Sequence, residues 1–137
     1  MASVTVNPFL LTDCLFQVEA DNYEAHVSKV EFAPSSSSTQ FKGLTPTAVF
    51  TFAGTSTWTC NLDFAQDWDT PGSLSRYLFE HEGEPLDVTF EPKKGGSAIT
   101  ATIVAIPGSI GGAVDGVATS SVSLGVHGRP ALEALTP

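Results

Sequence analysis

Residues 61–91 constrain the fold of this chain more than any other segment, because one helical pattern lies there between two β patterns. Apolar and polar side chains alternate at the start and at the end of the segment, which is typical of half-buried strands. Between these ends, Leu74, Tyr77 and Leu78 follow helical spacing within residues 71–82. The segment therefore predicts a strand, one short helix and a second strand.

The ends of this helix have their own signals. Thr70 is expected to cap it, because a hydroxyl can accept an otherwise unpaired backbone N–H. Pro71 suits the first helical position, where its missing N–H would be unpaired anyway. Gly83 is expected to stop the helix.

The remainder of the chain reads as β-structure. Asp21-Asn22 predicts the turn of a hairpin, and a bulge near Ser28-Lys29 would repair the register of its second strand. Residues 98–106 are apolar on both faces, which indicates a strand covered on both sides. We therefore expect a mainly β fold, a β-sandwich or barrel of about seven to eight antiparallel strands with one short flanking helix over residues 71–82.

The predicted organisation is a single domain spanning residues 1–137. Residues 1–13 are irregular and apolar and are expected to form an N-terminal arm. A long inter-strand loop is expected over residues 33–46, because Pro34 opens a low-complexity serine-rich run. Residues 128–137 are expected to form a C-terminal arm.

Charge is sparse and acidic in this chain. Only 15% of the residues are charged, and 15 acidic residues against 6 basic ones give a net charge of −9. Too few lysines and arginines cluster for a nucleic-acid clamp. The low charge suggests either surfaces that other subunits cover or a small β domain with a hydroxyl-rich surface, and the acidity alone is also explained by solubility.

Motifs for catalysis or metal binding are not evident. His26, His81 and His127 have no metal-ligand spacing, and we expect no metal, no cofactor and no enzyme activity. Cys14 and Cys60 lie in alternating patterns and are expected to be buried thiols of a protein made in a reducing cytoplasm. The uncharged stretch after residue 95 is broken by proline and glycine, so a membrane span is not expected.

A series of short motifs runs in a fixed order between residues 10 and 130. The motifs are Gln66-Asp67-Trp68, Pro71-Gly72-Ser73-Leu74, Tyr77-Leu78, Gly83, Val88-Thr89-Phe90-Glu91-Pro92, Ile110-Gly111-Gly112 and Gly128-Arg129-Pro130. In this order and spacing, the chain resembles the tail tube (major tail) proteins of long-tailed bacteriophages, the siphophage type.

The resemblance implies a structural virion protein. Its subunits would form hexameric rings, stacked helically into a tail tube that conducts genomic DNA through an acidic lumen. The implied partners are further copies of the chain and other tail proteins, such as the tape measure, terminator and baseplate proteins. Double-stranded DNA would pass transiently without specific binding, no membrane would be involved, and synthesis would occur in the cytoplasm of the bacterial host.

Candidate site residues follow from this reading. Glu19, Glu24 and Glu31, on the first predicted hairpin, are the candidates for the lumen, with solvated outer-face charge as the alternative reading. If these three face outward, Asp63 and Asp87 are the next candidates.

Two further sets concern contacts between subunits. A long flexible segment can order on assembly, so the predicted loop is expected to reach the adjacent ring. The inter-ring candidates are Ser36, Thr39, Phe41 and Lys42. The inter-subunit strand candidates are Thr100, Thr102 and Val104.

Other functions fit a small β domain as well. A capsid decoration protein or a minor tail protein belongs to the same broad class. A ligand-binding β-sandwich would expose aromatic side chains on one face. Trp58 has the buried parity and Trp68 lies at the helix entry, so the sequence gives no such aromatic platform.

Overall fold

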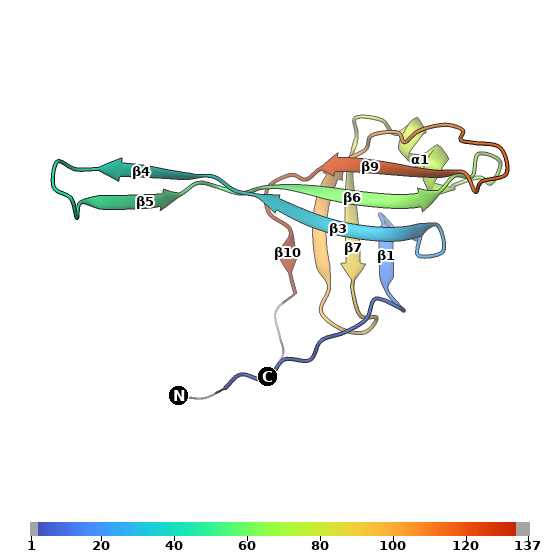
Figure 1. Cartoon of the computed structure of the whole chain (residues 1–137). Coiled ribbons are helices and arrows are strands. Elements are labelled where there is room, and N and C mark those ends of the chain that lie inside the picture. The colour runs from blue at the N-terminus through green and yellow to red at the C-terminus, as the bar shows by residue number, and fades with distance from the viewer. Residues whose placement is uncertain (1–2, 134–137) are drawn as a thin grey trace.

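The computed structural model describes residues 3–133, which contain ten strands and one helix (Figure 1). The elements in chain order are β1 (Leu15–Val18), β2 (Asp21–Asn22), β3 (Val27–Ser35), β4 (Ser38–Lys42), β5 (Val49–Ala53), β6 (Thr57–Ala65), α1 (Leu74–Glu80), β7 (Pro85–Glu91), β8 (Ile99–Val104), β9 (Thr119–Gly125) and β10 (Ala131–Leu132). The prediction of a mainly β fold with one short helix is confirmed.

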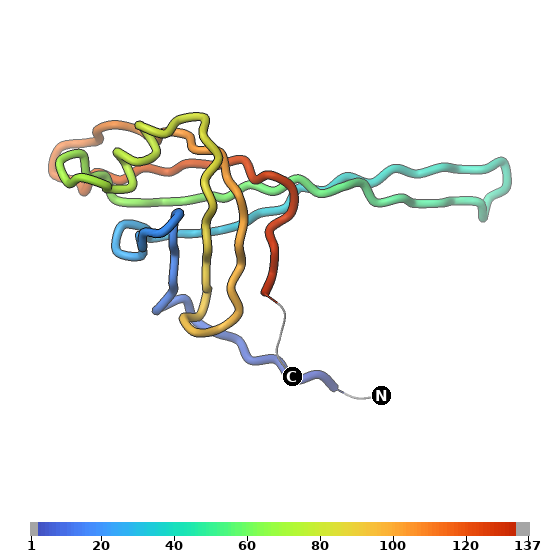
Figure 2. Tube along the Cα trace, turned by 180° about the vertical axis from the view of Figure 1, so that it is seen from behind, coloured from blue at the N-terminus to red at the C-terminus, as the bar shows by residue number. Residues whose placement is uncertain are grey.

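Two sheets form the body, and their strands cross steeply (Figures 1 and 2). One sheet has the order β10-β8-β7-β1-β2 and the other the order β3-β6-β9, all antiparallel. A separate pair, β4 and β5, projects from the body. Ten strands exceed the expected number because β2 and β10 have two residues each and β4 lies where a loop was predicted.

The core lies between the two sheets and under α1. Phe16 and Val18 of β1 point inward, as do Cys60, Leu62 and Phe64 of β6. Their neighbours in sequence point outward, so the alternation predicted for the start of residues 61–91 is present and begins before it, in β6. Each buried aliphatic or aromatic side chain of this kind contributes roughly 1.5–3 kcal/mol, and this burial holds the two sheets together.

The first predicted hairpin is wrong. β1 pairs with β7 along its whole length and with only two residues of β2, whereas β3 belongs to the other sheet. Tyr23 anchors the crossing between the sheets, because its ring is buried and its hydroxyl donates to the carbonyl of Gly72 at 2.8 Å. The turn lies at Glu19, whose φ is +56°, and not at Asp21-Asn22. The predicted bulge is confirmed between Val27 and Lys29.

The helix α1 is shorter than the predicted span of residues 71–82. Thr70 does not cap it: Ser73 occupies the N-cap position and makes no side-chain capping hydrogen bond. A carboxylate oxygen of Asp67 accepts the backbone N–H of Thr70 at 3.2 Å, which holds the preceding residues in a turn. Hydrogen bonding by Thr70 also lowers the pKa of the Asp67 carboxyl. The chain leaves the helix region through Gly83, where φ is +85° and glycine is favoured.

The predicted loop over residues 33–46 is also wrong, because most of it is strand. β3 continues to Ser35, and β4 pairs with β5 along its whole length, so only residues 43–48 form a turn. Pro34 is tolerated because β3 is an edge strand, where a missing N–H breaks no ladder. Serine and threonine occur in loops and in exposed strands alike, so composition misled the prediction.

The four strands β3, β4, β5 and β6 make one long ribbon that leaves the body (Figures 1 and 2). At the junction the backbone N–H of Gly54 donates to the carbonyl of Ser37 at 2.7 Å. A Cβ on Gly54 would lie 2.8 Å from the Ser37 hydroxyl oxygen and 3.2 Å from the Ser37 carbonyl oxygen, so the close approach favours glycine there. The hairpin is therefore hydrogen-bonded at its root.

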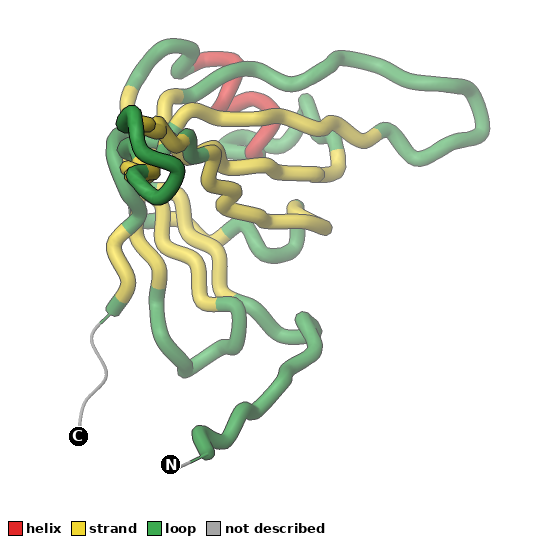
Figure 3. Tube along the Cα trace, turned by 60° about the vertical axis from the view of Figure 1, so that its left-hand side comes forward, coloured by secondary structure: helices red, strands yellow, loops and turns green. Residues whose placement is uncertain are grey.

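The two predicted arms differ. Residues 3–13 contain no helix or strand and are exposed (Figure 3). The C-terminal arm predicted over residues 128–137 is wrong for residues 131–132, which pair with β8 as β10. Residues 1–2 and 134–137 of these predicted arms lie outside the described residues. Between residues 3 and 133, no helix has the length and apolar character needed to cross a membrane.

Candidate assembly surfaces

One face of the β4–β5 hairpin is aromatic. Phe41, Phe50 and Phe52 share this face by their cross-strand register and are 62%, 54% and 61% exposed. The opposite face is more polar, although it includes Val49 and Ala53, and there the Gln40 amide donates to the Thr51 hydroxyl at 3.4 Å. A lone two-stranded hairpin is marginally stable in water, and contiguous exposed apolar side chains mark interaction sites. This aromatic face is therefore the strongest candidate for a contact with another molecule.

The hairpin tip, residues 42–49, adds an apolar residue and a cation. Leu44 at the turn is fully exposed, and Lys42 precedes the turn. The turn is closed by the backbone N–H of Gly43, which donates to the carbonyl of Ala48 at 2.7 Å. The exposed side chains of the tip are therefore held by a turn whose backbone is hydrogen-bonded.

The inter-ring residues predicted from sequence all lie on this ribbon. Thr39 and Phe41 lie on the aromatic face, Lys42 belongs to the tip, and Ser36 lies at the junction between β3 and β4. Sequence reasoning left out the two phenylalanines of β5. The sequence did contain a signal for them, because β5 alternates phenylalanine with smaller residues. It was missed because residues 33–46 were predicted to be a loop, so β5 was not expected to pair with a strand there and project from the body.

The outer face of the β3-β6-β9 sheet, here called the polar face, carries hydroxyls, amides and a few charges. Asn61 in the central strand donates to a carboxylate oxygen of Glu31 on β3 at 3.1 Å. On the other side, the hydroxyl of Ser123 on β9 donates to the Asn61 carbonyl oxygen at 2.8 Å. Asp63 and Ser121 face each other one pair further along. The face is hydrophilic and weakly acidic, with cross-strand hydrogen bonds.

The same sheet ends in an open strand on each side. β3 and β9 are its outermost strands, and within residues 3–133 neither forms a ladder with a strand other than β6. Just past β9, Val126 forms a single bridge with Ile103 of β8. Open edges present unpaired N–H and C=O groups, which are templates for pairing with another chain. The sequence indicated strands here, but not which of them would be outermost.

The predicted inter-subunit residues Thr100, Thr102 and Val104 lie on β8, on the outer face of the five-stranded sheet. β8 is an interior strand between β7 and β10, and its Thr102 carbonyl accepts the N–H of His127 at 2.8 Å. The Thr102 hydroxyl also donates to a carboxylate oxygen of Asp87 at 2.9 Å. The outermost strands of this sheet, β2 and β10, have two residues each, so the longer open edges belong to the three-stranded sheet.

The acidic candidates do not gather on one surface. Glu31 and Asp63 lie on the polar face. Glu19 lies at the β1–β2 turn, where its side chain accepts the backbone N–H of Asp87 at 3.1 Å, so these two belong to the five-stranded sheet. Glu24 lies in the connection between the sheets and lines a cavity. The three glutamates predicted for a lumen therefore occupy three separate places.

No cluster of three or more His, Cys, Asp or Glu side chains suited to a metal ion occurs in the described part of the chain. His81 lies 2.5 Å from a carboxylate oxygen of Glu84, and His26 lies 5.4 Å from Tyr23 between ring centroids. Each of these pairs joins residues of one turn or connection. Neither pair brings His26, His81 and His127 close to one another.

Comparison of the chain with protein-family models and with curated proteins finds no match. Neither comparison assigns a family. The function is therefore inferred from the surfaces of the molecule itself.

Proposed function

We propose that this chain is a tail tube subunit of a long-tailed bacteriophage. It forms hexameric rings, and these stack helically into the tube that conducts genomic DNA. The observation that carries the proposal is the β3-β6-β9 sheet, which combines an open strand on each side with a polar outer face. The motif order between residues 10 and 130 supports the same reading.

Ring formation uses the two open edges. β3 of one subunit pairs with β9 of the next, so the sheet continues from subunit to subunit. Such a head-to-tail contact leaves no open edge when the ring closes, and closure is how β-barrels avoid edge-to-edge aggregation. Stacking then uses the projecting ribbon, whose aromatic face is covered by the adjacent ring.

The polar face lines the lumen in this proposal, with Glu31 and Asp63 as the acidic groups and Lys29 opposite Asp63 as a single cation. A lumen of lysines would bind phosphates with an affinity that accumulates with each contact. Scattered carboxylates and hydroxyls repel the backbone weakly and over about one Debye length, roughly 8–10 Å at physiological salt. DNA therefore passes without specific binding.

The partners follow from the place in the tail. The subunit contacts further copies of itself, and the tube ends contact other tail proteins, such as the tape measure, terminator and baseplate proteins. The protein belongs to the virion and is made in the cytoplasm of the bacterial host. It needs no cofactor, acts on no substrate as an enzyme and does not enter a membrane.

Negative-stain microscopy of the purified protein tests the proposal. We expect rings or tubes of uniform diameter to form without added partners. Light scattering over a range of protein and salt concentrations gives the matching measurement in solution. A strictly monomeric species at high concentration, under every salt condition, would contradict the proposal.

A capsid decoration protein or a minor tail protein is the alternative, because a hairpin with an exposed aromatic face also suits docking on a preformed capsid or tail. Such a protein would remain monodisperse alone and bind only in the presence of its particle. The same microscopy experiment separates the two. A ligand-binding β-sandwich would use the hollow beside α1 that Trp68 and Phe79 line. The tail tube is preferred because three of the exposed aromatic side chains, Phe41, Phe50 and Phe52, share one face of the projecting hairpin.

A further inference from the structure

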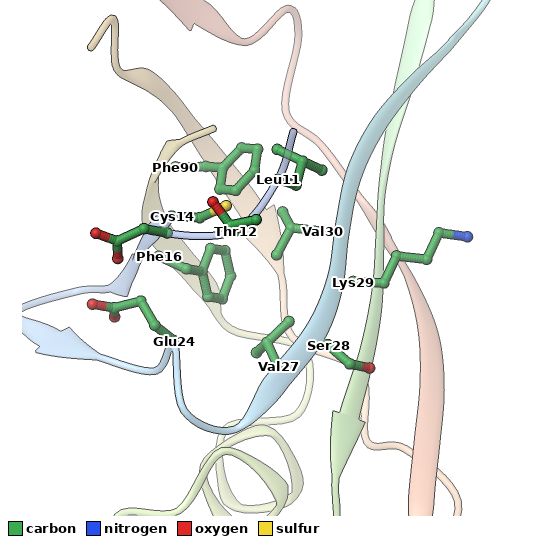
Figure 4. Close-up of a pocket in the computed structure, with 11 residues that line it drawn as sticks. Leu11, Thr12, Cys14, Phe16, Glu24, Val27, Ser28, Lys29, Val30 and Phe90 are labelled. Carbon is green, nitrogen blue, oxygen red and sulfur yellow. The ribbon is translucent and has the colours of Figure 1, made fainter. Parts of the chain in front are cut away.

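A cavity of about 320 Å³ opens at the side of the sandwich between β1 and β3 (Figure 4). Its floor is apolar, made by the rings of Phe16 and Phe90 and by the side chains of Val27 and Val30. A water molecule occupies about 30 Å³ of liquid, so a cavity of this size admits a large apolar side chain. Leu11 completes the wall from the N-terminal segment.

Glu24 stands at the rim of this cavity. One of its carboxylate oxygens is enclosed by protein and accepts no hydrogen bond from any residue between 3 and 133. An enclosed carboxylate oxygen without a partner is unfavourable, and a cation relieves that cost. Lys29 also lines the cavity, but it extends away on the far side (Figure 4). Among residues 3–133, no cationic side chain pairs with this rim carboxylate.

The hairpin tip has the complementary chemistry. Leu44 is 108% exposed, and Phe41 beside it is 62% exposed. Lys42 makes no ion pair with any described residue. The tip points away from the body and from the cavity of its own copy (Figures 1 and 2). It can reach such a cavity only on another copy.

We propose that the hairpin tip of one copy docks in the β1–β3 cavity of a second copy. Leu44 enters the apolar floor, and Lys42 pairs with Glu24 at the rim. This docking rests on the proposed self-assembly and names the surface that receives the hairpin. Edge pairing uses backbone groups of β3, whereas the cavity uses its inward-facing side chains, so the two contacts involve different atoms.

The chain provides its own reporter for this contact. Cys14 lines the cavity, whereas Cys60 is 0% exposed and burial raises its pKa to about 12, so Cys60 does not react. In assembled protein carrying Leu44→Cys or Thr45→Cys, a short bifunctional thiol reagent should join the tip to Cys14 of another copy. Denaturing gels without reductant would then show a ladder of linked chains.

Two matched variants control this experiment. Adding Cys14→Ser to either tip variant should abolish the ladder, which distinguishes tip-to-cavity links from tip-to-tip links. Moving the cysteine to Thr51, away from the tip and on the side of the hairpin opposite the aromatic face, should give little linking. A ladder that survives Cys14→Ser, or is equally strong from Thr51→Cys, would overturn the proposed docking.

Charge exchange tests the ion pair independently. Lys42→Glu and Glu24→Lys, made singly, should each raise the critical concentration for assembly about tenfold or more. The double variant should restore it toward the original value, because the pair is present again with reversed sign. Arg129→Glu, which alters charge in a different hollow, beside Thr55 and Trp58, should change it little. Failure of the double variant to recover would contradict the pair.

The outcomes separate the two proposals. Tubes without the Cys14-dependent ladder and without charge rescue would overturn the docking and leave the tail tube assignment standing. No assembly of the unmodified protein at any concentration or salt would overturn both.

Discussion

Phe41 and Phe50 face each other across the β4–β5 hairpin with ring centroids 6.4 Å apart, yet each exposes more than half of its surface. A cross-strand aromatic pair contributes roughly 0.2–1 kcal/mol, which is too little to hold a separate hairpin in water. The body of the protein gains nothing from these rings, because they lie outside its core. Their use must therefore be sought in contacts with other molecules.

Removing the aromatic face should abolish stacking into tubes and leave the body stable. In the variant Phe41→Ser/Phe50→Ser, we expect thermal unfolding to change little, since exposed substitutions usually alter stability within about 0.5 kcal/mol. Light scattering should detect no large particles. The control is Gln40→Ala/Thr51→Ala, on the side of the hairpin opposite the aromatic face, which should assemble normally. Normal tubes from the double serine variant would show that these rings are not an interface.

Excising the whole hairpin should have the same effect. Ser37 and Gly54 are already joined by a hydrogen bond of 2.7 Å, so residues 38–53 can be replaced by a short glycine link. The shortened chain should fold, as judged by circular dichroism and a cooperative unfolding transition. Rings could still form through the sheet edges, but long tubes should be absent by microscopy. Long tubes from this variant would refute the role of the ribbon in stacking.

Gly108 should tolerate no side chain. A Cβ there would lie 2.9 Å from the Ser120 Cβ and 3.0 Å from the Phe64 ring. Gly108→Ala should therefore lower the free energy of unfolding by about 1–3 kcal/mol, the usual range for an overpacked core. Gly112→Ala is the matched control, because its nearest contact would be 4.0 Å away. Urea unfolding of both variants measures the difference, and equal midpoints would contradict the packing.

Stability should fall at alkaline pH partly through Cys60. Burial raises the pKa of its thiol from 9.0 to about 12 in the folded protein. The unfolded chain thus releases this proton at a lower pH, and stability present below pH 9.0 is lost as pH rises toward about 12. Burial also raises the pKa of Tyr23 and Tyr77, which adds to the decline.

Cys60→Ala isolates the thiol contribution. Its absolute stability should be lower, since a buried group is trimmed, but its decline in urea midpoint between neutral and alkaline pH should be shallower than that of the parent. Cys14→Ala serves as the control and should keep the parental slope. An unchanged slope in Cys60→Ala would mean that other groups account for the whole effect.

The lumen assignment predicts a sheet-specific effect of charge reversal. Glu31→Lys/Asp63→Lys should assemble into tubes, but phage carrying it should eject DNA slowly, most severely at low salt where phosphate contacts are strongest. Glu19→Lys/Asp87→Lys on the five-stranded sheet is the matched pair and should eject normally. The opposite result would place that sheet toward the lumen.

The sequence predicted which side chains face the core more successfully than which strands are neighbours. The alternation around Cys60, Leu62 and Phe64 fixes one buried face, because a period of two depends only on the pleat. The same pattern in β1 does not distinguish β3 from β7 as its partner. That choice depends on the buried Tyr23 and its hydrogen bond to Gly72, which join residues far apart in the chain.

The candidate site was predicted in part. Ser36, Thr39, Phe41 and Lys42 do lie on one projecting element, although as a hairpin and not as a loop. The sequence analysis grouped the glutamates because they are close in sequence. They are separated in space because the chain passes from one sheet to the other between Glu19 and Glu31. The cavity was not predictable, since it is made by β1, β3, β7 and the N-terminal segment together.

The ribbon also has a mechanical consequence. Because β3 and β6 continue through the hydrogen-bonded junction at Ser37 and Gly54 into the β4–β5 hairpin, a load applied at the tip reaches the hydrogen-bond ladder of the body (Figure 1). In the proposed tail tube, bending during adsorption would load many such hairpins at once. If the proposed tube forms, such bending would act first on the backbone of this ribbon, which lies outside the side-chain core.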